Sequence, residues 1–458
     1  MAFIKSYGVY FPSFTIADNV LHPKGRANKH SIAYVDEDII TLAYAAIEVL
    51  KSKSNNLESV DAIIFATTTP VFKERYHASY LADLADLPKG ITALDLGTTN
   101  RAGTDALILA DTMISSGKHA NVLVVATDIS FPSIGKEART LFGHGAVAMI
   151  VSKDNGIAEI VNTASYSEAV AEEFVYKGER TRYDPRFART AGFKSNMKTV
   201  LSNLTPEDVD SLVINSAYVK LILKTLKTQG FDLQKQLAPD TLIPEYGFCG
   251  VAHGLLRLVS AMENVHGTSV LIDYNNGSNV IAINVAEKAQ ALSSETKDRK
   301  SINSYQDYLT IRKQGNFEGK GYKRIEMFSS EMIQEREKDQ LKYLKGFECR
   351  GCKTVYYMKS ARCNHCKGTE FVEKQLSKTG TVYSRTSEHY FPGSFPPINM
   401  IVVDLDGGGR ITVQQTDDMY QDEKSIINIG DRVSLVLRKM MENDAKPNYF
   451  FKCRIVNT

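Results

Sequence analysis

The sequence predicts an α/β protein in which two similar α/β halves are followed by a helical linker, a zinc ribbon and a small β-barrel of the OB-fold type. Three observations support this fold class. Residues 1–286 alternate continuous apolar runs with segments of helical periodicity, as α/β domains do. Two Cys-x-x-Cys pairs lie within residues 346–370. Short β-rich runs separated by turn residues occupy residues 371–458, which is typical of a small closed barrel.

Length and composition describe a multidomain globular protein. The chain has 458 residues, which suits about two to four domains. Its formal net charge is only +2, so no bulk field draws it to nucleic acid or to an anionic membrane. The start, Met1–Gly8, lacks a charged region followed by a long apolar run, and no apolar stretch is long enough to span a bilayer. Cysteine usage fits a reducing compartment, so we expect a cytoplasmic protein.

The first half, residues 1–165, contains one clear helix and several strands. Asp38–Leu50 places apolar residues at helical spacing among good helix formers. Continuous apolar runs predict strands that are covered on both faces. These runs are Val60–Ala66, Ile91–Leu96 and Val122–Ala126.

The second half, residues 166–286, repeats phrases of the first. Asn56–Thr67 and Asn203–Ser216 each consist of a polar segment, the pair Val-Asp and a buried strand. A second echo links two pairs of strands: Val122–Ala126 with Ala146–Val151, and Ser269–Tyr274 with Val280–Val285. We interpret the echoes as two similar halves; the alternative is that an α/β domain repeats such phrases by chance.

Residues 287–345 form the predicted linker. Their composition shifts to Lys, Glu, Gln and Ser, which indicates a solvated connector rather than a core. Helical stretches are expected around Tyr305–Arg312 and Ser329–Tyr343.

The cysteine pairs predict a structural zinc site. Each pair forms a tight knuckle with both thiolates on one side, and two facing knuckles surround Zn²⁺ with four sulfurs. Such a site leaves no position open for water or substrate, so the metal stabilises the fold. Disulfides or a redox Cys-x-x-Cys are the rival interpretations. The expected ligands are Cys349, Cys352, Cys363 and Cys366.

The last part, residues 371–458, predicts short strands joined by turns. Gly407–Gly409 marks a hairpin turn, and Cys453 lies in a strand-like run where we expect it in the core. About five strands is the number of an OB-fold. The expected strands include Thr379–Thr386, Asn399–Asp404, Arg410–Gln414 and Asp431–Leu437.

Residues 1–286 contain a series of short phrases in a recognisable order: Tyr7–Pro12, Asp36–Thr41, Arg101–Leu107, Gly143–Ala148 and the region from Ile157 to Phe193. In these phrases, this part of the chain resembles the thiolase superfamily, above all its 3-hydroxy-3-methylglutaryl-CoA synthase branch. The resemblance implies a duplicated, layered αβαβα fold, a homodimer formed through this domain, and an acyl-CoA ligand. The remainder resembles the zinc-ribbon and OB-fold proteins that accompany archaeal and bacterial thiolases, which implies a thiolase subunit as partner.

The resemblance also indicates that the catalytic positions have changed. The family's cysteine nucleophile falls at Asn100, whose amide has no electron pair with which to form an acyl-enzyme. The family's histidine falls at Asn215, which donates a hydrogen bond but moves no proton. Its oxyanion-binding amide falls at Phe248 and its glutamate at Thr68. The active site is therefore expected to be degenerate.

Three functions compete on these grounds. The leading hypothesis is a non-catalytic, acyl-CoA-handling subunit that serves a partner thiolase as a scaffold. The second is an active acyltransferase with a relocated nucleophile, Cys249, paired with His253 or His144. The opposing interpretation gives Cys249 a purely structural role, as a small buried apolar side chain.

The third hypothesis is a module that binds single-stranded nucleic acid, because basic and aromatic residues alternate around the cysteines. The near-neutral net charge opposes it, and the same cations suit the phosphates of coenzyme A. The alternating residues are Lys345, Arg350, Lys353, Tyr356, Tyr357, Lys359 and Arg362.

Overall fold

The structure is a computed structural model that forms two compact units. The first comprises Met1–Ile32, Leu42–Asp83 and Leu87–Asn303, and the second Ala33–Thr41, Leu84–Asp86 and Ser304–Thr458. The described residues are 1–22, 25, 28–53, 56–137, 140–169, 173–176, 179–202, 204–286, 299–312, 331–389, 395–420, 426–442 and 447–456. None of the helices in this described part combines the length and apolar character needed to cross a lipid bilayer.

A nine-stranded sheet runs through the first unit in the order β11-β12-β13-β8-β1-β7-β6-β4-β5. Its strands are β1 (Ala2–Tyr10), β4 (Ala62–Ala66), β5 (Thr92–Leu96), β6 (Asn121–Asp128), β7 (Gly145–Ser152), β8 (Ala158–Tyr166), β11 (Ser211–Ser216), β12 (Gly267–Tyr274) and β13 (Ser278–Val285). β4, β5 and β6 are parallel to one another, as are β11 and β12. Parallel strands are normally covered on both faces, which explains their continuous apolar sequences.

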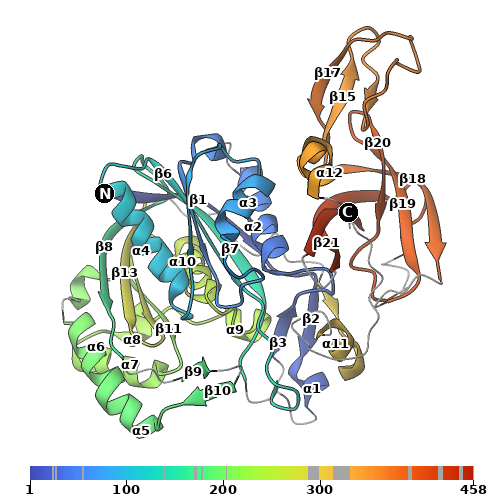
Figure 1. Cartoon of the computed structure of the whole chain (residues 1–458). Coiled ribbons are helices and arrows are strands. Elements are labelled where there is room, and N and C mark those ends of the chain that lie inside the picture. Colours follow the sequence, from blue (N-terminus) through green and yellow to red (C-terminus); the bar gives the residue numbers. More distant parts are fainter. Residues whose placement is uncertain are drawn as a thin grey trace. The chain divides into compact units, whose positions relative to one another are not determined.

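Helices cover this sheet in layers. α4 (Ala102–Ser115) and α10 (Ala252–Asn264) lie between its two halves, where they share one apolar core with both (Figure 1). α6 (Lys194–Val200) and α7 (Val219–Thr228) pack on the outer face of β11 and β12. α2 (Ile39–Lys53) and α3 (His77–Leu84) cover the strands of the first half on the face away from α4 and α10 (Figure 1).

Shorter elements complete the first unit. They are β2 (Phe14–Ala17), α1 (Asp18–Leu21), β3 (Lys29–Ile32), η1 (Asn56–Ser59), β9 (Glu173–Tyr176), β10 (Glu179–Arg182), α5 (Pro185–Phe187), η3 (Ala188–Phe193), η4 (Pro206–Asp208), α8 (Leu233–Gln236), α9 (Leu242–Tyr246) and β14 (Lys300–Ser301). β14 extends the β2–β3 pair by running parallel to β2.

The two halves repeat one arrangement, as the echoes predicted. In each, a short 3₁₀ turn precedes a Val-Asp pair and a buried strand. The two aspartates make the same kind of hydrogen bond. Asp61 accepts from the backbone N–H of Ala120 (2.7 Å) beside the start of β6, and Asp210 accepts from that of Thr268 (2.7 Å) at the start of β12. The similar halves are therefore present in structure as well as in sequence.

One strand departs from the expectation. The apolar run Ile91–Leu96 was predicted to be covered on both faces, yet every residue of β5 is half-buried or exposed. The reason is its place at the end of the strand order, where β4 is its one neighbour among the described strands. The second half has no matching edge strand among its described residues, only a parallel bridge between Leu212 and Leu237 beside β11.

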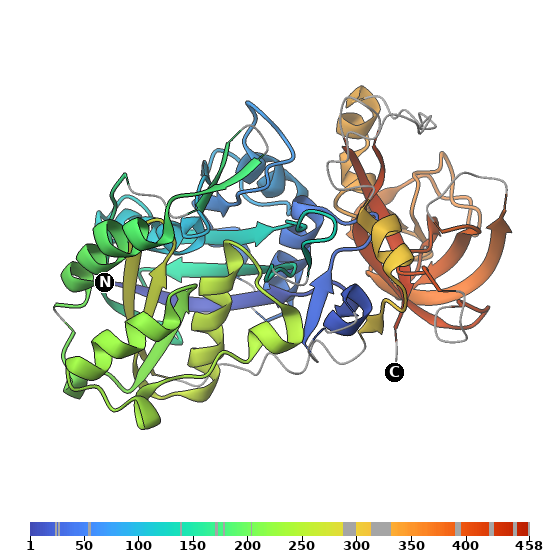
Figure 2. The ribbon, with the colours of Figure 1, turned by 90° about the horizontal axis from the view of Figure 1, so that it is seen from below.

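The second unit contains a three-stranded ribbon and a five-stranded barrel. The barrel order β20-β19-β18-β21-β22 is brought close to closure by a bridge from Gln415 to Cys453, and its strands curl around a common axis (Figure 2). Cys453 is fully buried in it, as expected. Gly407–Gly409 all have positive φ, which the hairpin turn requires. The strands are β18 (Thr379–Glu388), β19 (Ile398–Leu405), β20 (Arg410–Gln414), β21 (Arg432–Glu442) and β22 (Pro447–Ile455).

The ribbon consists of β15 (Lys345–Cys349), β16 (Val355–Tyr356) and β17 (Phe371–Gln375), with β15 in the centre. It is preceded by α11 (Tyr305–Arg312), α12 (Glu331–Arg336) and α13 (Lys338–Leu341). These helices lie where the linker sequence predicted helical stretches. Residues 287–298 and 313–330 of the predicted linker are outside the described residues.

Candidate functional site

Asn215 lies at the end of β11, where the structure ties it to a buried carboxylate. The parallel register sets it beside Asp273, and its Nδ2 donates to Asp273 Oδ1 at 3.1 Å. Asn275 Nδ2 bonds the same oxygen (2.9 Å), while Thr104 Oγ1 of α4 lies 2.7 Å from Asp273 Oδ2. Burial raises the pKa of Asp273 to about 6. The amide at the histidine position is thus part of a packed polar network.

Thr68, at the glutamate position, lies beside a second buried carboxylate. Asp128, the last residue of β6, accepts from Thr68 N (2.7 Å) at Oδ1 and from Thr68 Oγ1 (3.0 Å) at Oδ2. Its Oδ2 also accepts from Val251 N (2.9 Å), just before α10. Gly250 comes so close that an added Cβ would lie 2.2 Å from Asp128 Oδ2. Phe248 therefore belongs to a loop that Asp128 holds.

The first turn of α10 brings these two networks together. A Cβ added to Gly254 would lie 3.1 Å from Asp273 Oδ2 and 3.2 Å from Asn215 Nδ2. A Cβ added to Gly103 would lie only 2.1 Å from Val251 O. Glycine at both places lets α4 and α10 approach closely. Asp128, a carboxylate of the first half, thereby holds the start of α10, a helix of the second half.

Asn100 occupies the turn between β5 and α4. It is half-buried and follows Thr98, whose φ is +72°. Its neighbours hold the turn against the β12–β13 connection: Thr99 Oγ1 donates to Asn275 O (3.0 Å), and the guanidinium of Arg101 donates to Ser278 O (3.0 Å). Asn215 thus belongs to the Asp273 network directly, and Asn100 adjoins it through Thr99 and Asn275, whereas Thr68 and Phe248 are associated with Asp128.

Cys249, the candidate relocated nucleophile, is fully buried. Desolvation by burial raises the pKa of its thiol to about 12, so the thiol form prevails at neutral pH. Its sulfur bonds Gly247 O at 3.8 Å. His253 is close, but its Nδ1 accepts from the backbone N–H of Cys249 (3.4 Å) and its Nε2 donates to Asp240 (3.3 Å). The imidazole is therefore satisfied locally.

His144 and Phe248 each pack against an aromatic ring. The ring of His144 meets Phe131 edge-on at 4.6 Å between centroids, and its Nε2 lies 3.4 Å from Ser130 O. The ring of Phe248 lies 4.9 Å from that of His253. Both positions contribute aromatic packing to the region around the strand ends.

Asp128, Asp273 and Thr104 are site residues that the sequence patterns above do not predict. A signal was available, because each aspartate follows a continuous apolar run at corresponding points of the repeated strands. An acidic residue at the end of a buried strand needs hydrogen-bond donors around it. Those donors come from residues distant in the sequence, which only the fold brings together.

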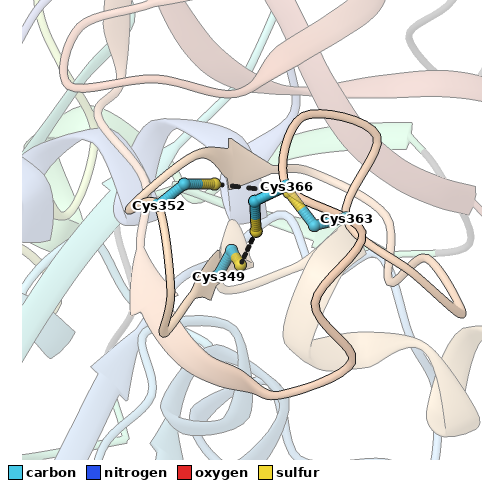
Figure 3. A group of neighbouring side chains, drawn as sticks. All are labelled: Cys349, Cys352, Cys363 and Cys366. Carbon is cyan, nitrogen blue, oxygen red and sulfur yellow. Dashed lines mark hydrogen bonds between the residues drawn. The ribbon is translucent and has the colours of Figure 1, made fainter.

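A separate candidate site lies in the ribbon of the second unit. Cys349, Cys352, Cys363 and Cys366 place their sulfur atoms within 4.8 Å of one another (Figure 3). Two matching turns present them. The N–H of Lys353 donates to Cys349 O and that of Lys367 to Cys363 O, both at 2.9 Å, and both lysines have positive φ.

The sulfur spacing fits a four-thiolate metal site. Cys349 and Cys366 are 3.5 Å apart and Cys352 and Cys363 are 3.4 Å apart, and all six cysteines of the chain are free. A disulfide would need about 2.05 Å. Metal–sulfur bonds of about 2.3 Å in a tetrahedron separate the sulfurs by roughly 3.8 Å. The four side chains together can bind a metal ion.

Comparison with known proteins agrees with both parts of the fold. Residues 94–169 match the family described as 3-oxoacyl-[acyl-carrier-protein] synthase III, and residues 373–438 match the ChsH2 C-terminal OB-fold domain. A hydroxymethylglutaryl-CoA synthase of Methanosphaera stadtmanae is 25% identical over 70% of this chain and 99% of its own length. A β-ketoacyl-[acyl-carrier-protein] synthase III of Aquifex aeolicus is 34% identical over 29% of this chain and 43% of its own.

Solved structures show the same fold. An HMG-CoA synthase complexed with CoA matches with a TM-score of 0.60 and 21% identity, over 72% of this chain and 95% of that one. The 3-oxoacyl-[acyl-carrier-protein] synthase III of Aquifex aeolicus matches with a TM-score of 0.53 and 21% identity, over 62% of this chain and all of that one. The first part of the chain is thus similar to hydroxymethylglutaryl-CoA synthases of the thiolase superfamily, and residues 373–438 are similar to the C-terminal OB-fold domain of ChsH2.

Proposed function

We propose that this chain is a non-catalytic subunit that handles acyl-CoA and acts as a scaffold for a partner thiolase in carbon–carbon bond formation or thiolysis. The proposal rests on the hydrogen bonds that the side chains at the substituted positions make. Thr68 and Asn215, which stand where the resemblance puts an acid and a histidine, are hydrogen-bonded to the buried carboxylates Asp128 and Asp273. Side chains committed in this way stabilise the fold instead of transferring protons.

The nucleophile position supports the same proposal. A carboxamide at Asn100 provides no thiolate, and loss of a covalent nucleophile alone lowers rates by about 10⁴- to 10⁶-fold. Cys249 is a poor substitute because its thiol is buried and its pKa is raised to about 12 by that burial. The alternative, an acyltransferase that pairs Cys249 with His253, requires Nδ1 of His253 to release the backbone N–H of Cys249 and to accept from the thiol instead.

The relatives suggest the ligand. One matching structure is described as an HMG-CoA synthase complexed with CoA, and another as the HMG synthase of the curacin biosynthetic pathway in complex with an acetyl donor acyl carrier protein. An acyl thioester of coenzyme A is the ligand that we propose for this chain. The nucleic-acid alternative draws no comparable support.

For the cysteine cluster we propose structural Zn²⁺. Four thiolates would complete a tetrahedral coordination sphere and leave no open position for chemistry. The metal would stabilise the ribbon, because the four thiolates are brought together only in the folded state. The free energy of zinc binding therefore adds to the free energy of folding.

Intact-mass spectrometry after incubation with acetyl-CoA tests the proposal. We expect no covalent acyl adduct and no turnover of acetyl-CoA with acetoacetyl-CoA by the isolated chain. Co-expression with a thiolase from the same genome is expected to give a stable complex that forms or cleaves the carbon–carbon bond. An acetyl adduct that disappears in Cys249→Ser would instead establish the acyltransferase alternative. Salt-dependent retardation of an oligonucleotide would support the nucleic-acid alternative.

A further inference from the structure

The second unit buries charged side chains between its barrel and a short N-terminal segment. Arg438 of β21 is 1% exposed and Lys452 of β22 is 3% exposed. The acidic run Asp36–Asp38 is also buried, and it belongs to this unit although it lies far away in the sequence. A buried charge is costly unless it is paired and hydrogen-bonded. The fold of this unit therefore depends on how these charges meet.

The cations and the acids pair directly. Arg438 Nη2 lies 2.9 Å from Glu37 Oε1, and its Nε lies 3.4 Å from Asp36 Oδ1. Lys452 Nζ lies 2.8 Å from Asp36 Oδ2. Asp417 of the barrel also contacts Arg438, at 3.6 Å, so the guanidinium lies among three carboxylates.

Uncharged groups of the barrel bind the same segment. Thr416 Oγ1 donates to Asp36 Oδ2 at 2.8 Å, and Tyr449 OH donates to Asp38 Oδ2 at 2.6 Å. The backbone N–H of Lys439 donates to the carbonyl of Asp36 at 2.9 Å. The barrel thus contacts both the side chains and the main chain of the segment.

The segment has a defined shape of its own. Tyr34 N donates to Glu37 Oε2 (2.8 Å), which closes a turn. Asp38 Oδ1 accepts from Ile40 N (3.0 Å) and Thr41 N (3.1 Å), so the same residue caps the start of α2. What the barrel binds is an acidic turn at the opening of a helix.

We propose that Arg438, Lys452, Tyr449 and Thr416 form an acid-binding face that recognises an acidic helix-opening segment, and that this recognition holds without covalent continuity between the segment and the barrel. In this protein the occupant is the chain's own Ala33–Thr41. The inference goes beyond the proposed function and is independent of it, since it concerns how the second unit is assembled from separate parts of the chain.

Cleavage of the full-length protein tests the face. A specific protease site is inserted between α11 and α12, so that Ala33–Thr41 and the barrel end on different fragments after cleavage. We expect the fragments to co-elute in size-exclusion chromatography, and to do so at about 1 M NaCl, because buried pairs are poorly screened by salt. The double variant Asp36→Asn, Glu37→Gln keeps side-chain volume and is expected to speed dissociation of the fragments at least about tenfold.

Arg432→Met is the matched control. Arg432 lies on β21 like Arg438, but its pair with Asp406 is about half-exposed, with side chains 43% and 43% accessible, so its loss is expected to leave the fragments associated. Circular dichroism of each uncleaved variant establishes that it is folded before cleavage. Separation of the cleaved wild-type fragments at high salt would refute the proposal, and so would equally tight association in the double variant.

Discussion

The two buried aspartates of the first unit look alike but have opposite hydrogen-bonding needs. Asp128 accepts from backbone N–H groups at both oxygens, which requires two acceptors. At Asp273 the partner Thr104 has one hydroxyl hydrogen, and Arg101 O lies 2.9 Å from the same Oγ1. When that hydrogen goes to Arg101 O, the bond between Thr104 and Asp273 needs a proton on the carboxyl group. An uncharged side chain at position 273 can therefore keep the contact with Thr104, whereas one at position 128 would leave a backbone N–H without an acceptor.

We predict that Asp273→Asn stabilises the protein at about pH 7.5, by about 1–3 kcal/mol. The raised pKa, about 6 against an ordinary 3.8, means that the folded state holds this proton more tightly than the unfolded chain. The wild type therefore loses stability as the pH rises through this interval, whereas a neutral amide does not. Urea titrations followed by circular dichroism should show the advantage of the variant shrinking as the pH is lowered to about 5.

Asp128→Asn provides the control of opposite sign. An amide at this position leaves either Thr68 N or Val251 N facing another donor, so a loss of about 1–3 kcal/mol is expected. If Asp273→Asn were as destabilising as Asp128→Asn at pH near 7.5, the claim that the buried carboxylate of Asp273 costs stability above its pKa would be wrong.

At the scale of elements, the ribbon is the part whose stability depends most on one group of side chains. Its three strands are short, and most of the described residues of the two knuckles are exposed or half-buried. Small modules of this kind gain little from an apolar core and rely on a metal or a disulfide. The four cysteine sulfurs lie together and are presented by two turns, each with a lysine of positive φ. A metal ion is therefore the expected source of stability.

Removal of the metal should therefore unfold the ribbon. We expect one zinc ion per chain by elemental analysis, lost on treatment with a strong chelator together with a gain of four reactive thiols. Cys363→Ser should abolish stoichiometric zinc, whereas Cys453→Ser, a change at a buried cysteine of the barrel, should retain it. Full zinc content in Cys363→Ser would contradict the assignment.

At the scale of the whole molecule, we expect the first unit to associate through the edge strand β5. It ends the sheet, and its residues are half-buried or exposed, including Leu94 and Leu96. Leu96 O accepts from Thr67 N on the side of β4. Since alternate residues of a strand point their polar groups to opposite edges, those of Ala93 and Asp95 point to the free edge. Such an edge suits pairing with a second copy.

We accordingly predict a homodimer that Ala93→Pro weakens. Proline removes an N–H from the free edge while leaving the bonds to β4 in place. Sedimentation equilibrium should give a dimer for the wild type and at least about a tenfold larger dissociation constant for the variant. A proline at the free edge that left dimerisation intact would exclude β5 as the interface.

The order of the elements followed from the sequence because it depends on local patterns. Apolar runs predicted β4, β6, β7, β12 and β13. Short β-rich runs and turn residues predicted the barrel strands, and spacing alone grouped the four cysteines. These features are written in residues that are close together along the chain. The exposure of β5 was not predictable in this way, because an edge strand and a central parallel strand share the same apolar composition.

What the sequence by itself determined was the fold class, the similarity of the two halves, the cysteine cluster and the identity of the side chains at the substituted positions. What only the tertiary structure decided was what surrounds those side chains. Asn215 meets Asp273, Thr68 meets Asp128, and Arg438 meets Glu37 across long separations in the chain. A charge buried by the fold must find its partner within about hydrogen-bonding distance, and that partner is set by packing rather than by neighbours in sequence.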